Sequence, residues 1–274
     1  MPLPPDEWTA ERLREALRKA AAALGVAPGT DEIWGWEGRG LSAPTDDDNF
    51  WLRLVVGNAA KDRNQAWDGA ETSQKAIPAR VPRPRFHVAV EWEEGEHRYR
   101  TELYERIRGT SLSTGALPPP GLRLPDAWWA SLRVSLEAIT SVVTGRIAVR
   151  QDRLDWAMPQ FLDAPSINTQ VPAWTTAHGD IQWGNLMGPK LVLMDWEKWG
   201  LAPVGYDEAC LYIPSLVVPD VADKVWQTFE PVLSSPAGHF SQLVVASEFL
   251  QGMARGNNLE LGPALRRKVA ELLP

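Results

Sequence analysis

Two short stretches hold most of the functional signal in this chain. Residues 178–185 read HGDIQWGN, and DWE follows at 195–197. The connecting NLMGPKLVLMDW (185–196) has two apolar runs on either side of a Gly-Pro-Lys turn, which is typical of a β-hairpin. A hairpin centred near that lysine places Asn185 and Asp195 opposite each other or one register step apart. Directly opposed residues have Cβ atoms roughly 4.5–5.5 Å apart, so we expect these side chains to lie together.

An amide oxygen and a carboxylate at that separation could share one metal ion. The ion that suits them is Mg²⁺, which prefers oxygen ligands, takes only about one or two of them from protein, and fills its other positions with water and phosphate oxygens. Asp180 lies five residues before Asn185 and could face the same point from the loop. A carboxylate that does not hold the metal tightly can orient a hydroxyl group and accept its proton. Together, Asp180, Asn185 and Asp195 would be the minimal equipment for phosphoryl transfer.

This pair of stretches resembles the catalytic and metal-binding region of aminoglycoside phosphotransferases and choline-type kinases, which are small-molecule kinases with a protein-kinase-like fold. The family pattern is His-Gly-Asp, four residues, Asn, and then a strand that ends in Asp, and the sequence matches it in order and spacing. The resemblance implies that Asp180 is the catalytic base or hydroxyl-orienting residue and that Asn185 and Asp195 are Mg²⁺ ligands. It also implies that His178 holds the shape of the loop, and that Asp207 supports the loop from the following helix.

The same resemblance implies an α+β, two-lobed fold, with a small β-rich N-terminal lobe and a larger, mainly helical C-terminal lobe. The order of elements along the chain favours the same architecture. TAERLREALRKAAAALGV (9–26) has the apolar spacing of an amphipathic helix that starts at a Thr9 cap. Residues 32–56 are predicted to be strand, loop and strand, and 65–79 a short helix. FHVAVEW and HRYRTELYERI are predicted strands joined by a turn at EEGE.

The boundary between the lobes is expected in RGTSLSTGALPPPG (108–121), which is rich in Gly, Ser and Pro and lacks periodicity. Residues 1–108 then form the nucleotide-binding lobe, and 109–274 the catalytic and substrate-binding lobe. The second lobe is mainly helical, with helices predicted over 126–144 and 152–162.

The resemblance extends to ATP-binding residues of the first lobe. WLRL (51–54) resembles the strand with the phosphate-contacting cation, which here is Arg53, as in the choline-kinase branch. A planar arginine fork can hold phosphate oxygens. Glu71 is the expected acidic partner of this cation, with Asp68 as the alternative. Because a single arginine on a strand is more often simply solvated, this assignment depends on the rest of the match.

GRGLSA (38–43) resembles the loop that covers the ATP phosphates. Gly38 and Gly40 would let backbone N–H groups approach the phosphates, and Ser42 would also contact the nucleotide. The stretch lacks the full G-x-G-x-x-G, so an ordinary turn is the competing interpretation.

ELYERIRG (102–109) resembles the strand and hinge that receive adenine. The backbone from Glu105 to Ile107 would contact the base. A plain strand that leaves a sheet fits the same residues, because backbone recognition leaves little trace in a sequence.

Composition restricts the class of protein and of partner. The chain has 274 residues, enough for two lobes with a substantial core, and a net charge of −7 with a pI near 5.2. Such an acidic chain is a poor nucleic-acid binder and suits small cationic partners. No segment approaches the roughly 18 apolar residues that cross a bilayer, and no secretory signal is visible. The single cysteine, Cys210, excludes an internal disulfide and fits a reducing cytoplasm.

Other chemistries fit the sequence less well. A metallohydrolase would need further His and Asp clusters, and the remaining histidines show no ligand spacing. The G-x-S-x-G elbow of serine hydrolases and the G-x-x-x-x-G-K-[ST] phosphate loop are absent from the sequence. A protein kinase would have an Arg before the catalytic Asp as well as D-F-G and A-P-E motifs, and these are absent too.

The expected function is therefore ATP- and Mg²⁺-dependent phosphorylation of a hydroxyl group on a small molecule, such as a cationic, aminoglycoside-like antibiotic. A metabolic kinase for an amino alcohol or a sugar is almost as well supported, and a catalytically inactive nucleotide-binding module is a third interpretation. The sequence leaves the oligomeric state open. The helical lobe would bind the acceptor. Its candidate residues are the acidic Asp152, Asp155, Glu197, Glu208 and Glu248 and the aromatic Trp156, Trp183 and Trp199.

Overall fold

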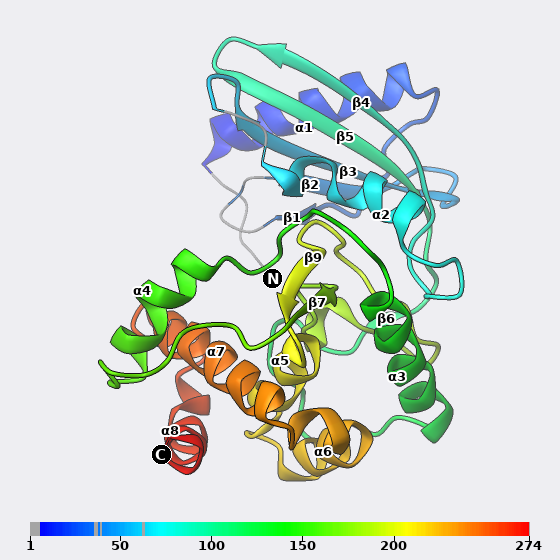
Figure 1. The fold of residues 1–274 in the computed structure, drawn as a ribbon. Coiled ribbons are helices and arrows are strands. Elements are labelled where there is room, and N and C mark those ends of the chain that lie inside the picture. Colours follow the sequence, from blue (N-terminus) through cyan, green and yellow to red (C-terminus); the bar gives the residue numbers. More distant parts are fainter. Residues whose placement is uncertain (1–5, 36–37, 39, 62–63, 274) are drawn as a thin grey trace. The chain divides into compact units, whose positions relative to one another are not determined.

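The computed structural model of the protein describes residues 6–35, 38, 40–61 and 64–273 (Figure 1). The chain divides into two compact units. The first unit consists of Met1–Lys75 and Pro84–Arg108, and the second of Ala76–Arg83 and Gly109–Pro274. The short segment 76–83 therefore packs with the second unit, although it lies within the N-terminal lobe of the sequence-based division.

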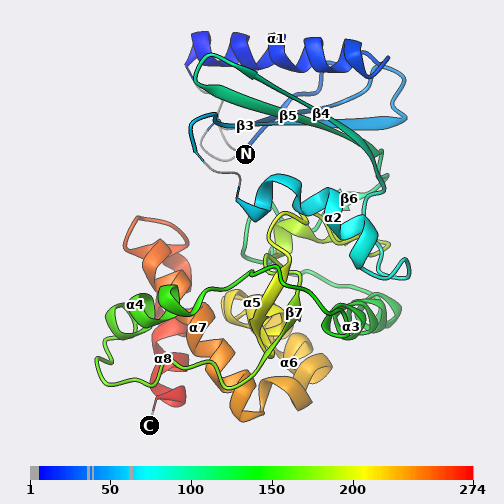
Figure 2. The same ribbon diagram turned by 45° about the horizontal axis from the view of Figure 1, so that its top comes forward.

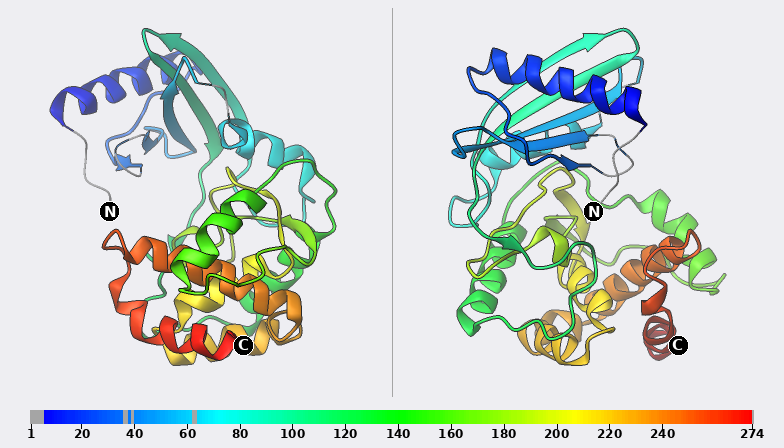
Figure 3. Two further views of the ribbon diagram at one scale, coloured as in Figure 1. Left: turned by 60° about the vertical axis from the view of Figure 1, so that its left-hand side comes forward. Right: turned by 180° about the vertical axis from the view of Figure 1, so that it is seen from behind.

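Helix α1 (Glu7–Ala23) covers one face of the sheet of the first unit (Figure 3). The helix begins at Asp6, whose carboxylate accepts a hydrogen bond from the Thr9 N–H at 3.0 Å. The cap is thus Asp6 rather than the predicted Thr9, because the aspartate satisfies an N–H group that the first turn leaves unpaired. Leu13 and Leu17, one helical turn apart, are buried in the core beneath the helix.

In the described part of the chain, the sheet of the first unit has five antiparallel strands in the order β1-β2-β3-β5-β4. They are β1 (Ile33–Trp34), β2 (Gly40–Pro44), β3 (Phe50–Asn58), β4 (Phe86–Glu94) and β5 (His97–Glu105). The register sets Arg53 directly opposite Ser42 on one side and Glu102 on the other. Side chains alternate between the two faces of a strand. Leu52 and Leu54 are buried in the core under α1, so this polar row lies on the face that α1 does not cover.

Strands β4 and β5 form the predicted hairpin. Glu94 pairs with His97, and Gly95 makes the turn with a φ of +58°, a conformation that glycine adopts without strain. The predicted helix at 65–79 is divided into a short 3₁₀ turn, η2 (Gln65–Asp68), and the helix α2 (Gly69–Ala76).

The second unit is mainly helical (Figure 2). Its helices are α3 (Asp126–Thr140), α4 (Gln151–Phe161), α5 (Tyr206–Ser215), α6 (Pro219–Leu233), α7 (Pro236–Met253) and α8 (Gly262–Leu272). Two pairs of short antiparallel strands accompany them: β7 (Trp174–Ala177) with β9 (Gly200–Pro203), and β6 (Thr110–Ser111) with β8 (Met187–Gly188). None of the helices in the described ranges has the length and apolar character needed to cross a lipid bilayer.

The core of the second unit contains several tryptophans. Trp183 is fully buried, donates its indole N–H to the Ser215 hydroxyl at 3.0 Å, and stacks on Trp128. Trp199 is buried as well. The expectation that these two indoles face a ligand is therefore wrong, since both fill the core. Trp156 on α4 is the only one of the three candidates with an exposed ring, at 47%.

The segment Ala76–Arg83 is tied to the second unit at its C-terminal end. The Leu193 N–H donates to the carbonyl oxygen of Pro82 at 2.9 Å. The guanidinium group of Arg83 donates to carbonyl groups of its own segment and lies over the Trp196 ring, 5.8 Å from its centroid. The segment thus packs beside the DWE stretch, which explains why it belongs with the second unit.

The burial of Trp183 predicts a large loss of stability on truncation. We expect Trp183→Ala to lower the free energy of unfolding by about 3–5 kcal/mol, because it leaves a cavity and removes the hydrogen bond that the indole donates to the Ser215 hydroxyl. The exposed Trp156→Ala should cost less than about 1 kcal/mol. Chemical denaturation of both variants measures the difference, and equal losses would contradict the core position of Trp183.

Candidate active site

Asp207 holds the backbone of the HGD loop. Strand β7 ends at Ala177, and the next two backbone N–H groups, of His178 and Gly179, donate to the two carboxylate oxygens of Asp207 at 2.7 and 3.0 Å. Asp207 lies in the first turn of α5 and is buried. Burial raises the pKa of its carboxyl, while the hydrogen bonds from the two backbone N–H donors oppose that rise. One carboxylate thus determines the path of the chain into Asp180.

His178 links this loop to the strand before Asp195. Its Nε2 lies 2.9 Å from the Met194 carbonyl oxygen, and its Nδ1 accepts the Asp180 N–H at 3.3 Å. A ring with one donor and one acceptor nitrogen is neutral, and burial lowers its pKa accordingly. The ring also packs edge-on against Trp196, with 4.5 Å between centroids. Both ring nitrogens are therefore engaged in holding the loop.

Gly179 allows the loop to approach the segment after DWE. Its φ is +79°, and a Cβ atom at this position would lie 2.6 Å from the Lys198 carbonyl oxygen and 2.8 Å from the Ala148 Cβ. No side chain fits that space, and the backbone conformation itself favours glycine. The glycine of HGD is thus required for close packing.

Asp180 is partly exposed and forms an ion pair with Lys198. The Lys198 Nζ lies 3.2 Å from Asp180 Oδ1, and a quarter of the Asp180 side chain is exposed. Desolvation raises the pKa of the Asp180 carboxyl, Lys198 opposes this rise, and the nearby charge of Asp195 adds to it. The carboxylate therefore sits between a cation and a second anion.

Asn185 has a fixed amide orientation. Its Nδ2 donates to the Asp180 carbonyl oxygen at 2.9 Å. That bond leaves Oδ1 on the other side of the amide, and no described residue donates to it. An amide oxygen held in this way is available to a cation.

The segment after Asn185 turns back as a hairpin. Leu186 and Leu193 form an antiparallel bridge, and the Met194 N–H donates to the Asn185 carbonyl oxygen at 2.8 Å. Met194 is therefore the residue opposite Asn185, and Asp195 lies one register step beyond it. This is one of the two predicted registers. Asp195 is exposed and has a φ of +62°, a conformation that is uncommon for a residue with a side chain and concentrates at functional sites.

Asn185 Oδ1 and the Asp195 carboxylate are oxygen donors, which suits Mg²⁺. In the described ranges, no group of three or more His, Cys, Asp or Glu side chains is placed to hold a metal ion by itself. The two residues would be a partial ligand set, as is usual for an ion that keeps several waters and phosphate oxygens.

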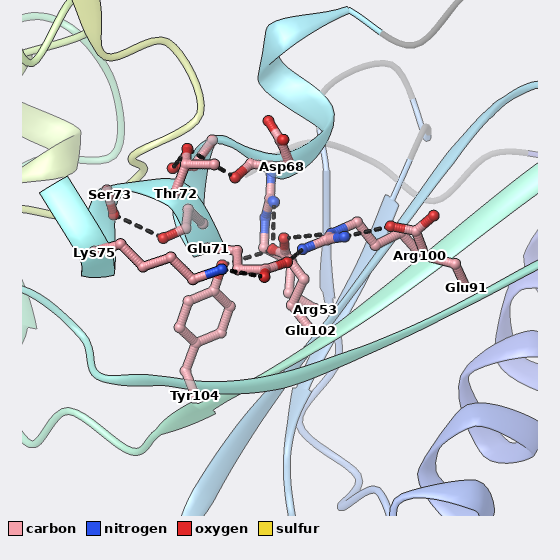
Figure 4. Close-up of polar contacts among 12 residues, drawn as sticks. Arg53, Asp68, Glu71, Thr72, Ser73, Lys75, Glu91, Arg100, Glu102 and Tyr104 are labelled. Atoms are coloured by element: carbon pink, nitrogen blue, oxygen red, sulfur yellow. Dashed lines mark hydrogen bonds and ion pairs between the residues drawn. The ribbon is translucent and has the colours of Figure 1, made fainter. Parts of the chain in front are cut away.

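Figure 4 shows the polar network around Arg53 in the first unit. The Arg53 Nη1 lies 3.1 Å from the Glu102 Oε2. Glu102 is 2% exposed, and it also binds the Arg100 Nε at 2.8 Å and the Tyr104 hydroxyl at 2.6 Å. Arg100 further pairs with Glu91. Burial disfavours the charge of Arg100, but its carboxylate partners outweigh that effect and raise its pKa.

Glu71 and Asp68, the two predicted partners of Arg53, come from the segment that contains α2. Glu71 binds Lys75 at 3.0 Å and Arg100 at 3.2 Å, so Arg100 and Glu102 connect it to Arg53. Whether Glu71 supports Arg53 stays a prediction. Glu102 belongs to no predicted site motif, because only the pairing register of β3 and β5 shows that it lies opposite Arg53.

The predicted phosphate loop is shorter than expected. Strand β2 begins at Gly40 and includes Ser42, and both residues pair with β3. Ser42 therefore belongs to a strand and not to a loop. A Cβ on Gly40 would lie 2.7 Å from the Leu54 carbonyl oxygen, so the close strand packing requires glycine. Gly38 has a φ of +68°, and position 39 of the predicted loop lies outside the described residues.

Among the residues that the structure describes, the predicted hinge has one backbone N–H group without a hydrogen-bond acceptor. The Glu105 N–H donates to the Arg85 carbonyl at 2.9 Å, and the Arg106 N–H donates to the Asn49 carbonyl at 3.0 Å. No described residue accepts the Ile107 N–H. A ligand that binds this hinge through a backbone N–H would therefore use Ile107.

The acidic candidates for acceptor binding differ in their surroundings. Asp152 pairs with Arg150, and Asp155 accepts hydrogen bonds from its neighbours Gln151 and Thr169. Burial raises the pKa of Glu208 to about 7, which suits a core position. Glu248 on α7 accepts the Tyr206 hydroxyl at 3.0 Å, and desolvation raises its pKa to about 7. Its charge also acts on Lys198, the ionic partner of Asp180. Among these four, Glu248 is the acid whose surroundings link it to Asp180.

No family model matches the sequence, and a search of curated proteins finds no match. Among solved structures, aminoglycoside phosphotransferase APH(4)-Ia is similar, with a TM-score of 0.61 and 13% identity over 97% of this chain and 98% of that chain. A thermostable mutant of APH(4)-Ia in ternary complex with ADP and hygromycin B has a TM-score of 0.59 and 12% identity, over 92% and 96% of the two chains. A Haemophilus somnus protein assigned as a fructosamine-3-kinase has a TM-score of 0.53 and 10% identity, over 96% and 100%. The chain thus has the protein-kinase-like α+β fold of these small-molecule kinases, and the predicted fold class is confirmed.

The close approach at Gly179 predicts that this position does not tolerate a side chain. We expect Gly179→Ala to lower the free energy of unfolding by about 2 kcal/mol or more, because the methyl group overlaps the Lys198 carbonyl and the backbone is left-handed. Gly145→Ala is the matched control, since a Cβ there meets nothing within 4 Å, and it should change stability by less than about 1 kcal/mol. Thermal and chemical denaturation measure both, and a neutral Gly179→Ala would show that the two segments do not pack as described.

Proposed function

We propose that the protein is an ATP- and Mg²⁺-dependent phosphotransferase that acts on a hydroxyl group of a small molecule. The observation that supports this most strongly lies within the second unit. A single loop and hairpin carry three oxygen-bearing groups: the partly exposed carboxylate of Asp180, the amide oxygen of Asn185 and the exposed carboxylate of Asp195. The Asn185 oxygen accepts no hydrogen bond from a described residue. These groups can supply the metal ligands and the hydroxyl-orienting carboxylate that phosphoryl transfer uses.

Asp180 is the residue that acts on the acceptor. Its carboxylate orients the hydroxyl group and accepts its proton as the oxygen attacks the γ-phosphorus. Asn185 and Asp195 would hold the Mg²⁺ ion. When bound, that ion neutralises charge on the phosphate oxygens. His178 and Asp207 contribute by holding the backbone of the loop, through the hydrogen bonds of both ring nitrogens and both carboxylate oxygens.

The first unit would bind the nucleotide. Arg53 contacts the phosphates with its planar guanidinium fork, which the buried Glu102 orients, and Glu71 supports the same network from α2. Gly40 and Ser42 would approach the phosphates from β2. Further residues proposed for the nucleotide are Glu105 and Ile107, whose backbone would contact the adenine. The ADP complex of a structurally similar enzyme is in keeping with this role.

The acceptor is proposed to be a polar or cationic small molecule in the cytoplasm. A net charge of −7 and the electrostatic influence of Glu248 on Lys198, the partner of Asp180, favour a ligand with an amino group, such as an aminoglycoside-like antibiotic. An amino alcohol or a sugar is the alternative acceptor, in keeping with the similarity of fold to an assigned fructosamine-3-kinase. A nucleotide-binding module without activity would bind MgATP and transfer nothing to any of these.

Replacing the proposed base tests the reaction. We expect Asp180→Asn to lower phosphoryl transfer about 100-fold or more, because the amide cannot accept the hydroxyl proton, while nucleotide affinity stays within about twofold. ADP release from MgATP with hygromycin B, ethanolamine or a hexose measures transfer, and calorimetry with AMP-PNP measures binding.

Asp223→Asn is the control, since this aspartate is exposed on α6. It should retain wild-type rates. Normal turnover by Asp180→Asn would remove the assignment, and no phosphorylated product from the wild type with any acceptor would favour the inactive module.

Replacing the proposed phosphate cation tests the nucleotide site separately. We expect Arg53→Gln to weaken AMP-PNP binding about 10-fold, because it removes a charge-assisted contact to the phosphates. Arg98→Gln, on β5 and paired with Glu93, serves as the matched control and should bind as the wild type does. Equal affinities for Arg53→Gln and the wild type would place the phosphates elsewhere.

A further inference from the structure

Lys198 is a cation at the proposed site that no motif of the sequence identifies. It follows Asp195 by three residues, in the connection between the hairpin and β9. Its Nζ lies 3.2 Å from Asp180 Oδ1. In the described ranges, no other lysine or arginine pairs with Asp180. The cation therefore acts on the group that would receive the acceptor proton.

The backbone on both sides of Lys198 is held in place. Arg146 donates from Nε to the Trp199 carbonyl at 3.1 Å and from Nη2 to the Glu197 carbonyl at 3.1 Å. Its guanidinium also lies over the buried Trp199 ring, 4.9 Å from the centroid. Gly179 packs directly against the Lys198 carbonyl. These contacts hold the backbone at Lys198 in place, and the side chain extends from there to Asp180.

Three carboxylates act electrostatically on the Lys198 ammonium group, and one of them, Asp180, is in contact with it. Desolvation would favour the neutral amine, but Asp180, Asp195 and Glu248 outweigh it and raise the pKa of Lys198, so the lysine stays charged. Its contact is with Oδ1 of Asp180, and no described residue donates to Oδ2. Oδ1 of Asp180 is therefore engaged by Lys198, and Oδ2 can still accept a hydrogen bond from a ligand.

We propose that Lys198 is a positioning residue for phosphoryl transfer, which holds Asp180 through Oδ1 so that Oδ2 faces the acceptor hydroxyl. This inference rests on the proposed function. In the reaction the acceptor oxygen forms a bond to the γ-phosphorus while the bond from that phosphorus to the bridging oxygen breaks, and ADP leaves with the electron pair. The hydroxyl proton passes to Asp180 Oδ2. Lys198 neither gives nor takes a proton.

The competing view is an ordinary surface ion pair. The Lys198 side chain is 56% exposed, and exposed pairs stabilise a fold by at most about 1 kcal/mol. Such a pair would leave kcat unchanged when broken. A positioning role predicts the opposite, because a catalytic group displaced by about 1 Å loses roughly 100-fold in rate although the fold is intact.

The experiment compares Lys198→Met, Lys198→Arg and the control Lys190→Met, which removes an exposed lysine at the hairpin turn. The probe is MgATP, with ADP release measured without an acceptor and with hygromycin B, ethanolamine or a hexose. We expect Lys198→Met to lower kcat roughly 100-fold, while KM for ATP, AMP-PNP affinity and Tm stay near wild-type values. Lys198→Arg should recover most of the rate, and Lys190→Met should match the wild type.

Each other outcome contradicts the inference in a distinguishable way. Wild-type turnover together with an unchanged kcat in Lys198→Met would overturn the inference and leave the proposed function standing. A loss in Lys198→Met that parallels a fall in Tm, or that appears equally in Lys190→Met, would make the role structural. No ADP release by the wild type under any condition would remove the proposed function, and the inference with it.

Discussion

The Asp207 carboxylate accepts hydrogen bonds from the backbone N–H groups of His178 and Gly179, and the geometry of the candidate site depends on this interaction. Asp207 comes from the start of α5, so a helix of the core determines where the loop turns. The bonds direct the His178 ring toward Met194 and bring Gly179 against Lys198. A buried carboxylate is costly unless its oxygens are paired, and here both of them are. The loop and the hairpin are therefore joined by hydrogen bonds from His178 to Met194 and from Asn185 to Asp180.

Charge is organised differently in the two units. In the first, Arg53 and Arg100 share the buried Glu102, and further carboxylates complete the network, so the cations are held without leaving a buried charge unpaired. A ligand with phosphate groups would meet a preoriented guanidinium there. In the second unit, Asp180 and Asp195 are anions close enough to influence each other, and Lys198 offsets part of that repulsion. A divalent cation would reduce the repulsion between the two carboxylates further. This is a physical reason for such a site to bind a metal ion before it binds a polyanion.

Local sequence patterns predicted the parts of the structure that depend on residues close together in the sequence. The spacing of Asn185 and Asp195 about a Gly-Pro turn predicted that they lie opposite each other or one register step apart, and the structure has the second arrangement. Alternation in 86–105 predicted the β4–β5 hairpin. Contacts between distant segments were missed. Glu102 meets Arg53 through strand pairing, and Lys198 meets Asp180 through a close approach that only Gly179 permits. Burial is also a property of the whole fold, so the indoles of Trp183 and Trp199 could not be assigned to the core from their own surroundings in the sequence.

The central claim is that one loop and one hairpin of the second unit form a Mg²⁺–phosphate site. Its most direct test is titration of AMP-PNP into the wild type, Asn185→Ala and Asp195→Ala, each with Mg²⁺ and with EDTA. The account predicts that Mg²⁺ strengthens binding to the wild type about 10-fold or more and that both variants lose this dependence, since each removes an oxygen ligand. The same strengthening by Mg²⁺ in the wild type and in both variants would contradict it.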